Sequence, residues 1–371
     1  MKFLDLIQLN PKIKLEKGQE FPFVEMSNVN IYPREPQHVE IKKYTAGVKF
    51  QQWDTVVARI EPCLQNGKGF FAKDIYEGFG STEFLVFRPK DERVNNKFLY
   101  YFMLTDGIRK NMISSMTGAT GRQRVNNDIF KTLEISLPSI EKQKRISDIL
   151  STYDDLIENN QKQINLLEEA AMRLYKEWFV NLRFPGYETG KIVDSLPEGW
   201  EYKEVGSLIT KMPRTKQVKT SEYKIIGKIP IIDQSRDFIA GFTDDSDTIV
   251  TSEVPVIVFG DHTRILKLIS FPFAKGADGT QLIVSGAEEM PQYLFYCSLV
   301  NIDLSNYHYA RHFKYLKATS IIVPTIDIAV KFENIIEPYF KAIQSLRDKI
   351  IRLQKGRDIL LPKLMTNEIE V

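Results

Sequence analysis

Cysteine is scarce in this chain, and so are long apolar runs. Its 371 residues include two cysteines, Cys63 and Cys297, with no C-x-x-C spacing. This excludes a zinc ribbon and a disulfide framework, and it fits a reducing compartment. No apolar run approaches the ~18 residues of a transmembrane helix, and the first 18 residues lack the apolar segment of a signal peptide. The sequence therefore predicts a cytoplasmic protein.

An excess of charge of one sign is also lacking. The net charge is +2, with 20 Lys and Arg against 16 Asp and Glu in residues 1–138, and 14 against 15 in residues 196–324. The segment "DDSD" at 244–247 is locally acidic. A surface that binds nucleic acid must therefore arise from the local arrangement of side chains, because the overall charge gives no attraction.

Motifs for catalysis are missing as well. There is no G-x-x-x-x-G-K-[ST] phosphate loop and no G-x-G-x-x-G after a strand-like run. Asn10-Pro11 lacks the second proline and the aromatic residue of an amino-methyltransferase motif. The histidines give no convincing metal spacing, since His308 and His312 lie four apart in a segment that reads as a loop. We expect a non-catalytic chain that binds no metal.

What the sequence does contain is a repeat. With Pro138 aligned to Pro324, the following residues match without a gap, as in Ile149 with Ile335 and Tyr153 with Tyr339. Upstream, "STEFLVF" (81–87) resembles "DGTQLIV" (278–284), "KFLYYFML" (97–104) resembles "QYLFYCSL" (292–299), and "WDTVVARI" (53–60) loosely resembles "EVPVIVFG" (253–260). The pattern indicates a tandem duplication of a globular part followed by a long helix.

The helical parts have a coiled-coil period. Spacings of four and three alternate from Ile146 to Trp178 and again from Phe332 to Leu364, which is typical of packed helix pairs. Ser139 and Thr325 are candidate N-caps. Proline gives three further expectations: helix ends near 185–186 and at Pro362, and a kink or restart at Pro338.

The expected fold class is α+β: two globular α/β domains in tandem, each followed by a long helix. The helices, spanning roughly 54–60 Å, are expected to pair as an antiparallel coiled coil with pseudo-twofold symmetry. Asn160, at a core position of the first helix, either fixes the register of that pair or is an ordinary surface residue. The expected boundaries are 1–138 (first domain), 139–184 (central helix), 185–195 (linker), 196–324 (second domain) and 325–371 (distal helix and tail).

Several stretches resemble a known family. Residues 118–179, which include "GRQRVNNDIFKTLEISLPSIEKQKRI", resemble the central region of specificity subunits of Type I restriction–modification enzymes. "LPEGWEYKEVGSLI" (196–209) is similar to the opening of a target-recognition domain, residues 256–283 to the middle of one, and the end, "RDILLPKLMTNEIEV", to the distal repeat. The first domain departs from this pattern, because it lacks an "LPEGW"-like opening and begins with "MKFLDLIQLNPKIKL".

The resemblance implies a DNA specificity subunit. Two target-recognition domains would each read half of a bipartite sequence, and the paired helices would set the gap and dock two methyltransferase subunits. Restriction subunits would join in the full complex, and S-adenosylmethionine, ATP and Mg would belong to the partners. Because the helical repeats match while the globular parts differ, we expect an asymmetric target.

Candidate DNA-contacting residues follow from the donors that base edges and phosphates accept. In the first domain, the segment "TGRQRVNN" contains the best cluster, and the further candidates lie after "TVVA" and in "NGKG"; together they are Arg122, Gln123, Arg124, Asn126, Arg59 and Lys68. In the second domain the candidates lie in three segments: Arg214, Lys216 and Lys219; His262, Thr263 and Arg264; and Tyr309, Arg311, His312 and Lys314.

Two alternatives remain open. Trp178 and Phe179 are expected to pack partly on the globular domains and partly on a methyltransferase partner, or else entirely within the chain. The competing interpretation of the whole chain is a coiled-coil structural adaptor whose two domains bind proteins, which the low net charge favours slightly. Binding that weakens steeply with salt would distinguish a DNA reader from such an adaptor.

Overall fold

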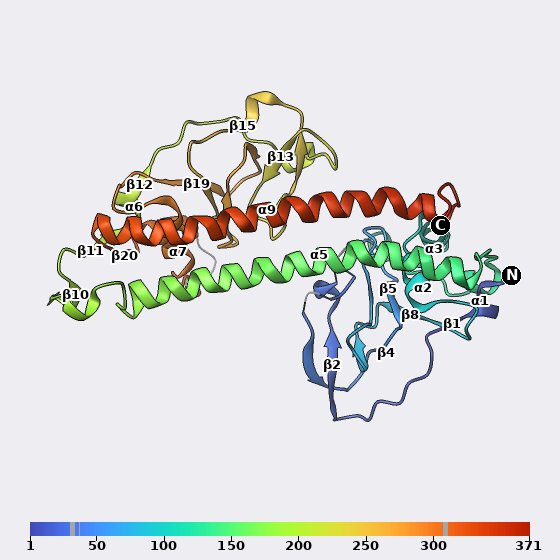
Figure 1. Ribbon diagram of the computed structural model, residues 1–371. Coiled ribbons are helices and arrows are strands. Elements are labelled where there is room, and N and C mark those ends of the chain that lie inside the picture. Colours follow the sequence, from blue (N-terminus) through green and yellow to red (C-terminus); the bar gives the residue numbers. More distant parts are fainter. Residues whose placement is uncertain (30–33, 37, 307–310) are drawn as a thin grey trace. The chain divides into compact units, whose positions relative to one another are not determined.

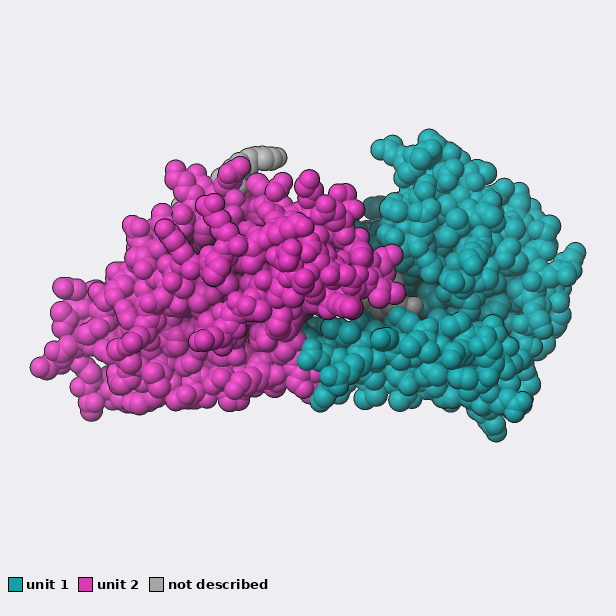
Figure 2. Space-filling model, turned by 90° about the horizontal axis from the view of Figure 1, so that it is seen from above, with its two compact units in different colours: residues 1–162, 347–371 teal, residues 163–346 magenta. Residues whose placement is uncertain are grey.

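The computed structural model describes residues 1–29, 34–36, 38–306 and 311–371, and its fold class is α+β as expected. The chain forms two compact units, shown in Figure 2: unit 1 contains residues 1–162 and 347–371, and unit 2 contains residues 163–346. Each unit thus combines one globular part with segments of two long helices. None of the helices in the described part of the chain combines the length and the apolar composition that a membrane span requires.

The long helices are α5 (Ile140–Tyr175), continued by a π-helical turn at Lys176–Val180, and α9 (Ile326–Met365). Ser139 caps the first, because its Oγ accepts a hydrogen bond from the Lys142 amide at 3.4 Å. The second is continuous through Pro338 and Pro362, so the expected restart and the expected end are both wrong. Both prolines are exposed, so water can satisfy the carbonyls that lose an amide partner.

The helix segments pair inside each unit. In unit 1, Ile146 and Leu150 of α5 pack in one apolar cluster with Leu361 and Leu364 of α9. One turn further along α5, Asp154 bonds to Arg357, which lies one turn earlier in α9. These helix segments therefore run antiparallel, as expected. Asn160 is buried, so its interpretation as a surface residue is wrong.

In unit 2, the end of α5 lies against the beginning of α9. The ring of Phe332 is 5.6 Å from that of Trp178 and 5.0 Å from that of Phe179. Phe179 also contacts Trp200, which follows the "LPEG" turn. Trp178 and Phe179 are both buried in this aromatic cluster, which accounts within the chain for much of the aromatic content of the segment.

The globular part of unit 1 contains two four-stranded sheets. The first, entirely antiparallel, has the order β1 (Ile7–Leu9), β8 (Phe84–Pro89), β5 (Thr55–Ala58), β6 (Gly69–Phe71). The second has the order β3 (Glu40–Lys43), β2 (Glu20–Val24), β7 (Glu77–Gly80), β4 (Val48–Gln51), in which β2 and β7 are parallel.

Unit 2 repeats this arrangement. Its first sheet has the order β12 (Ile209–Thr210), β19 (Thr280–Ser285), β16 (Val256–Gly260), β17 (Leu266–Ile269), again antiparallel. Its second has the order β14 (Gly241–Thr243), β13 (Ile229–Ile232), β18 (Phe273–Lys275), β15 (Ile249–Val250), with β13 and β18 parallel. Strand order and pairing sense agree throughout, so the duplication extends through the globular parts.

Alternation along the central strands builds the core of unit 1. Val56 and Val86 point into a cluster with Phe50 and Phe70, whereas their neighbours Val57 and Leu85 point into a cluster with the helices. This is the period of two that a strand buried on both faces requires. The β5 and β8 segments, recognised from the repeat, are therefore the centre of the unit.

Short elements complete the two units. Unit 1 contains the helices α1 (Phe3–Leu6), α2 (Asn96–Met103), α3 (Asp106–Ser114) and α4 (Ile129–Thr132), with a 3-10 turn at Met26–Asn28. Unit 2 contains α6 (Val205–Leu208), α7 (Gln292–Val300) and α8 (His312–Ala318), 3-10 turns at Tyr187–Thr189, Thr220–Glu222 and Ser246–Thr248, and the strand pairs β9 (Ile192–Val193) with β10 (Leu196–Pro197) and β11 (Glu201–Glu204) with β20 (Ser320–Val323). The helices α2 and α7 occupy the repeated positions "KFLYYFML" and "QYLFYCSL".

Candidate nucleic-acid interface

The first candidate surface lies at the end of strand β5. The amide of Val125 donates to the carbonyl of Arg59 at 2.9 Å, and the Arg59 guanidinium donates to the carbonyl of Val125 at 3.3 Å. The amide of Glu61 donates to the carbonyl of Gln123 at 2.9 Å. The structure thus brings together Arg59 and the segment 121–126, which lie more than 60 residues apart in the sequence.

The glycines of this segment permit its turn. Gly118 and Gly121 have φ values of +119° and +78°, which residues with a side chain rarely adopt. Arg122 and Asn126 are exposed, and Gln123 is half-buried. The side-chain oxygen of Asn126, Oδ1, accepts from the Asp128 amide at 3.0 Å.

Two carboxylates lie among these donors, and no motif in the sequence points to them. Glu83, just before β8, makes a forked ion pair with Arg124 at 2.7–3.0 Å. The hydrogen bonds to Glu83 raise the pKa of Arg124. Glu61 accepts from the Gly121 amide at 3.1 Å. A hydrogen-bond acceptor that binds Arg124 therefore has to compete with Glu83.

Lys68 has a structural contact. Its Nζ donates to the carbonyl of Met26 at 3.3 Å, in the connection that follows β2. This bond uses one of the three ammonium donors. Lys68 therefore holds the connection between β2 and β3 beside β6.

The second candidate surface lies at the end of strand β16, the counterpart of β5. His262, Thr263 and Arg264 follow the strand and are exposed, as expected from the apolar run before them. Thr263 Oγ1 donates to the carbonyl of Gln234 at 2.7 Å. Arg264 has a φ of +62° and donates to the carbonyl of Leu304 at 3.0 Å, so the turn is fixed at both sides.

The segment 311–314 meets the same strand end. The Asp261 carbonyl accepts from the His312 amide at 3.0 Å and lies 2.8 Å from His312 Nδ1, while its carboxylate accepts from the Phe313 amide at 2.8 Å. Arg311 and Lys314 are exposed, but His312 is only 5% exposed and opens helix α8. The expected loop position of His312 is thus wrong, because Asp261 holds the histidine inside. Tyr309 lies outside the described residues.

The basic run 214–219 has acidic neighbours. Lys216 pairs with Asp245 at 2.6 Å, which raises the pKa of the lysine, and the Lys219 amide donates to Glu222 at 3.2 Å. Arg214 and Lys219 have exposed side chains. The acidic segment 244–247 therefore compensates part of this run, as the low net charge of the second domain requires.

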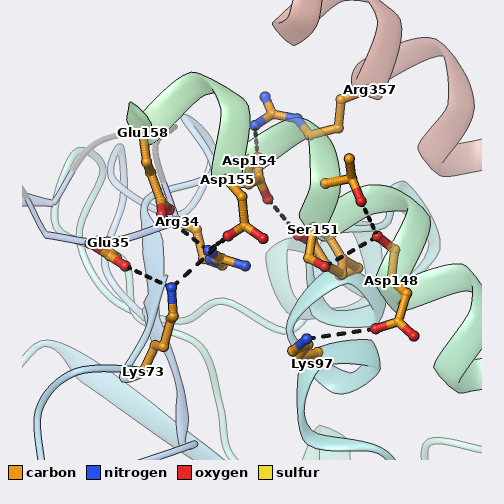
Figure 3. A network of polar contacts seen from close by, with 12 residues as sticks. Arg34, Glu35, Lys73, Lys97, Asp148, Ser151, Asp154, Asp155, Glu158 and Arg357 are labelled. Atoms are coloured by element: carbon orange, nitrogen blue, oxygen red, sulfur yellow. Dashed lines mark hydrogen bonds and ion pairs between the residues drawn. The ribbon is translucent and has the colours of Figure 1, made fainter. Parts of the chain in front are cut away.

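A buried polar network joins the globular part of unit 1 to the long helices (Figure 3). The Arg34 guanidinium lies between Asp155 and Glu158 of α5, at 2.5 and 3.1 Å. Asp154 accepts from the Tyr101 hydroxyl and from Arg357 of α9, whose side chain is 1% exposed. The sequence indicates this network only through Arg357, which is a charged residue at a position of the heptad pattern where apolar residues are expected.

Unit 2 makes the corresponding connection by capping. Glu333 of α9 accepts from the amides of Tyr293 and Leu294 at 3.0 Å each, at the beginning of α7. The orphan amides of a helix N-terminus are favourable partners for a carboxylate. Burial raises the pKa of Glu333, and these two amides oppose the shift.

The described residues hold no group of three or more His, Cys, Asp or Glu side chains that could bind a metal ion. What the two surfaces offer is hydrogen-bond donors: guanidinium, ammonium and amide groups on turns that backbone bonds fix. Such donors suit the acceptors of phosphates and base edges.

Comparisons with known proteins agree with this chemistry. The family model of the Type I restriction modification DNA specificity domain matches residues 8–169. The Type I restriction enzyme MjaIX specificity subunit of Methanocaldococcus jannaschii is 28% identical over 310 residues, which cover 76% of this chain and 71% of that protein. The EcoAI specificity subunit of Escherichia coli is 30% identical over 162 residues, which cover 41% of this chain and 28% of that one.

A solved structure has a similar fold. The S subunit of the Type-I restriction-modification system from M. genitalium superposes with a TM-score of 0.57 at 16% identity, covering 98% of this chain and 95% of that chain. At this identity the likeness concerns the fold, and it extends over both units.

Proposed function

This chain belongs to the specificity-subunit family of Type I restriction–modification systems, and we propose on that premise that it reads a bipartite DNA sequence. Unit 1 would read one half of the target and unit 2 the other. The chain itself would carry no catalytic group. The methyl donor, ATP and Mg would be bound by partner subunits.

One observation carries the proposal. In two units of the same topology, a segment with basic residues is bonded to the same end of the same central strand: 121–126 at β5, and 311–314 at β16. Fixed turns of this kind hold side-chain donors in place before binding, so less ordering entropy is lost when they meet DNA. Phosphate contacts would set the register, and base-edge contacts would set the sequence.

The side chains at the two strand ends support an asymmetric target. Unit 1 presents Arg59, Gln123 and Arg124, whereas unit 2 presents His262, Thr263 and Arg311. Because each base pair has its own pattern of donors and acceptors in the major groove, different side chains at equivalent places select different half-sites. Asn126, Lys68 and Lys314 would add further contacts, and Arg122, Arg214, Lys216, Lys219 and Arg264 would contact phosphates.

The long helices are proposed to dock two methyltransferase subunits, with restriction subunits joining the full complex. Exposed apolar side chains suited to such docking occur on both helices, among them Leu156 and Leu166 on α5 and Val330 and Ile335 on α9. Trp178 and Phe179 are left out of this surface, because both are buried among the aromatic residues of unit 2.

Mapping methylated bases in the source cell, with and without the gene, tests the proposal. One two-part motif with unlike halves is expected to lose its methylation when the gene is deleted and to regain it on complementation. If every methylated motif survives the deletion while the methyltransferase subunits are present, the proposal is wrong, and the adaptor interpretation replaces it.

A second measurement separates reader from adaptor directly. The complex of the chain with its methyltransferase subunits is titrated with duplex DNA between 50 and 200 mM salt. With six or more phosphate contacts, affinity should fall by about a thousandfold or more over that range. An adaptor that binds proteins through its two domains would show no such loss.

A further inference from the structure

A third connection lies at the same strand end in unit 2, and no residue of it was among the sequence candidates. Residues 233–240, "DQSRDFIA", join β13 to β14, and the hairpin closes where the Ala240 amide donates to the carbonyl of Ile231 at 2.9 Å. The connection contacts the turn after β16 through Gln234. We infer, on the premise of the proposed function, that Arg236 of this connection reads a guanine base in the half-site of unit 2.

Gln234 ties the connection to the turn of His262 and Thr263. Its side-chain oxygen accepts from the His262 amide at 3.1 Å, its side-chain nitrogen donates to the carbonyl of Asp278 at 2.8 Å, and its own carbonyl accepts from Thr263. Since both ends of the amide are used, Gln234 is a positioning residue rather than a reader.

Glycines make this close approach possible. A Cβ on Gly260 would lie 2.8 Å from the Cβ of Gln234, and a Cβ on Gly279 would lie 2.8 Å from its Nε2. Gly279 also has a φ of +82°. Side chains at these two places would push the connection away from the strand end.

A buried lysine supports the connection from below. Lys267 of β17 is 5% exposed, and its Nζ donates to the carbonyl of Asp233 at 2.8 Å and to that of Asp237. Burial lowers the pKa of this lysine, opposed by the nearby Asp233 and Asp237. Burying an ammonium is costly unless its donors are satisfied, so its bonds to both sides of residues 234–236 restrain the connection.

Two further contacts restrain its ends. The Asp233 carboxylate accepts from the Ser235 amide at 2.8 Å, and Phe238 packs against Phe271 with ring centroids 6.2 Å apart. Arg236 lies between these anchors and is exposed. Two other basic side chains of unit 2 are engaged with carboxylates, Lys216 with Asp245 and Lys224 with Asp244. Among the described residues, the Arg236 guanidinium has no hydrogen bond or ion pair.

An unengaged guanidinium on a restrained connection suits base reading. Its planar fork matches the O6 and N7 acceptors of guanine in the major groove, and the restrained backbone limits the orientations of the fork. A lysine can replace an arginine at a phosphate but not at a bidentate base contact. The two roles therefore predict different results for Arg236→Lys.

The test is a selection from duplexes with randomised half-sites, using the chain assembled with its methyltransferase subunits. Arg236→Ala and Arg236→Lys are both expected to lower the preference for guanine at one position of one half-site by about tenfold. The half-site of unit 1 should be unchanged and serves as the control for folding. The matched control is Lys228→Ala. Lys228 is exposed and directly precedes β13, at the end of the strand opposite the 233–240 connection, so this variant should leave the preference at both half-sites unchanged.

Three outcomes would overturn the inference. The guanine preference could be unchanged in both Arg236 variants, or it could change in the same way with Lys228→Ala. Alternatively, Arg236→Ala could weaken binding to every sequence while Arg236→Lys binds as the wild type does. Weakening that does not depend on sequence, and that lysine repairs, would make Arg236 a phosphate contact. A wild-type complex that selects no two-part sequence at all would instead overturn the proposed function, so the two failures are distinguishable.

Discussion

Unit 1 and unit 2 share a topology but use different chemistry at equivalent places. Unit 1 joins α5 to α9 and to its globular part through buried ions, centred on Asp154, Glu158 and Arg357, whereas unit 2 uses edge-to-face aromatic contacts around Phe332 and the cap made by Glu333. The strand order survives in both because it depends on backbone pairing and on alternating apolar residues. Side chains outside that pattern were free to diverge.

The connection after the second strand shows the same divergence. In unit 1 it spans residues 25–39 and contributes Arg34, which is buried against α5. In unit 2 it spans residues 233–240 and presents Arg236 to solvent. In both units a lysine from the neighbouring hairpin, Lys68 or Lys267, holds the connection. The same connection therefore carries an arginine that stabilises the fold in unit 1 and an arginine that we propose to contact DNA in unit 2.

The largest effect on stability is expected from truncating the side chain at the centre of each helix contact, Arg357 in unit 1 and Phe332 in unit 2. Arg357→Ala in unit 1 leaves Asp154 buried without its cation and should lower the free energy of unfolding by about 3–5 kcal/mol. Phe332→Ala in unit 2 leaves a cavity and should cost about the same. Denaturant unfolding measures both, and hydrogen exchange should place the loss mainly in the unit that carries the change.

Paired replacement separates the two chemistries. Arg357→Met combined with Asp154→Leu should restore much of the loss, because apolar residues can replace a buried ion pair. Arg352→Ala, at an exposed position of α9, is the control. A double variant no more stable than Arg357→Ala would show that the ions are specifically required.

A smaller effect is expected from the titration of Glu158 in unit 1. Burial raises the pKa of Glu158 to about 7 from 4.5, opposed by Arg34. The folded chain therefore binds this proton more tightly than the unfolded chain. The resulting stabilisation is complete below pH 4.5 and is lost as pH rises through 7, on the order of 1–3 kcal/mol.

Glu158→Gln, which cannot titrate, tests that dependence. Between pH 5 and 8, the unfolding free energy of the wild type should fall relative to that of the variant, and hydrogen exchange should place the change in unit 1. A constant difference between the two proteins across this range would contradict the assignment. The Glu158→Gln variant is the reference, because Glu333 of unit 2 titrates in both proteins.

The smallest effect concerns Glu83, which competes with DNA for Arg124. Glu83→Gln should strengthen binding of the complex to its target DNA by about two- to fivefold, the range expected from releasing an exposed ion pair. Arg124→Ala should abolish the gain. If Glu83→Gln weakens binding, the carboxylate positions Arg124 for DNA instead of competing for it.

The sequence predicted the features that are local or repeated. "TVVA" is strand β5 at Thr55–Ala58, and the heptad spacing marks both long helices. The bond between Arg34 and Glu158 joins residues 124 apart, and no pattern in the sequence pairs them. The burial of His312 depends on Asp261, 51 residues away, so a segment that reads as a loop became the beginning of a helix.

The candidate site was predictable in the same measure. Arg59 and the segment 121–126 do meet, because both adjoin the central strand that the repeat identified. Their carboxylate neighbours and the connection that carries Arg236 were missed, since charge counts and short motifs do not show which loops converge. Which loops meet at the end of a strand depends on the order of the strands in the sheet, and recognising the strand segments in the sequence does not give that order.

The central claim is that each unit reads its own half of one target. The most direct test is a methylation map from cells that carry the Gln123→Ala, Arg124→Ala double variant in place of the wild-type chain. The account predicts a motif changed or relaxed in one half only, with the other half and the gap between them preserved. A motif that changes in both halves together, or in neither, would contradict it.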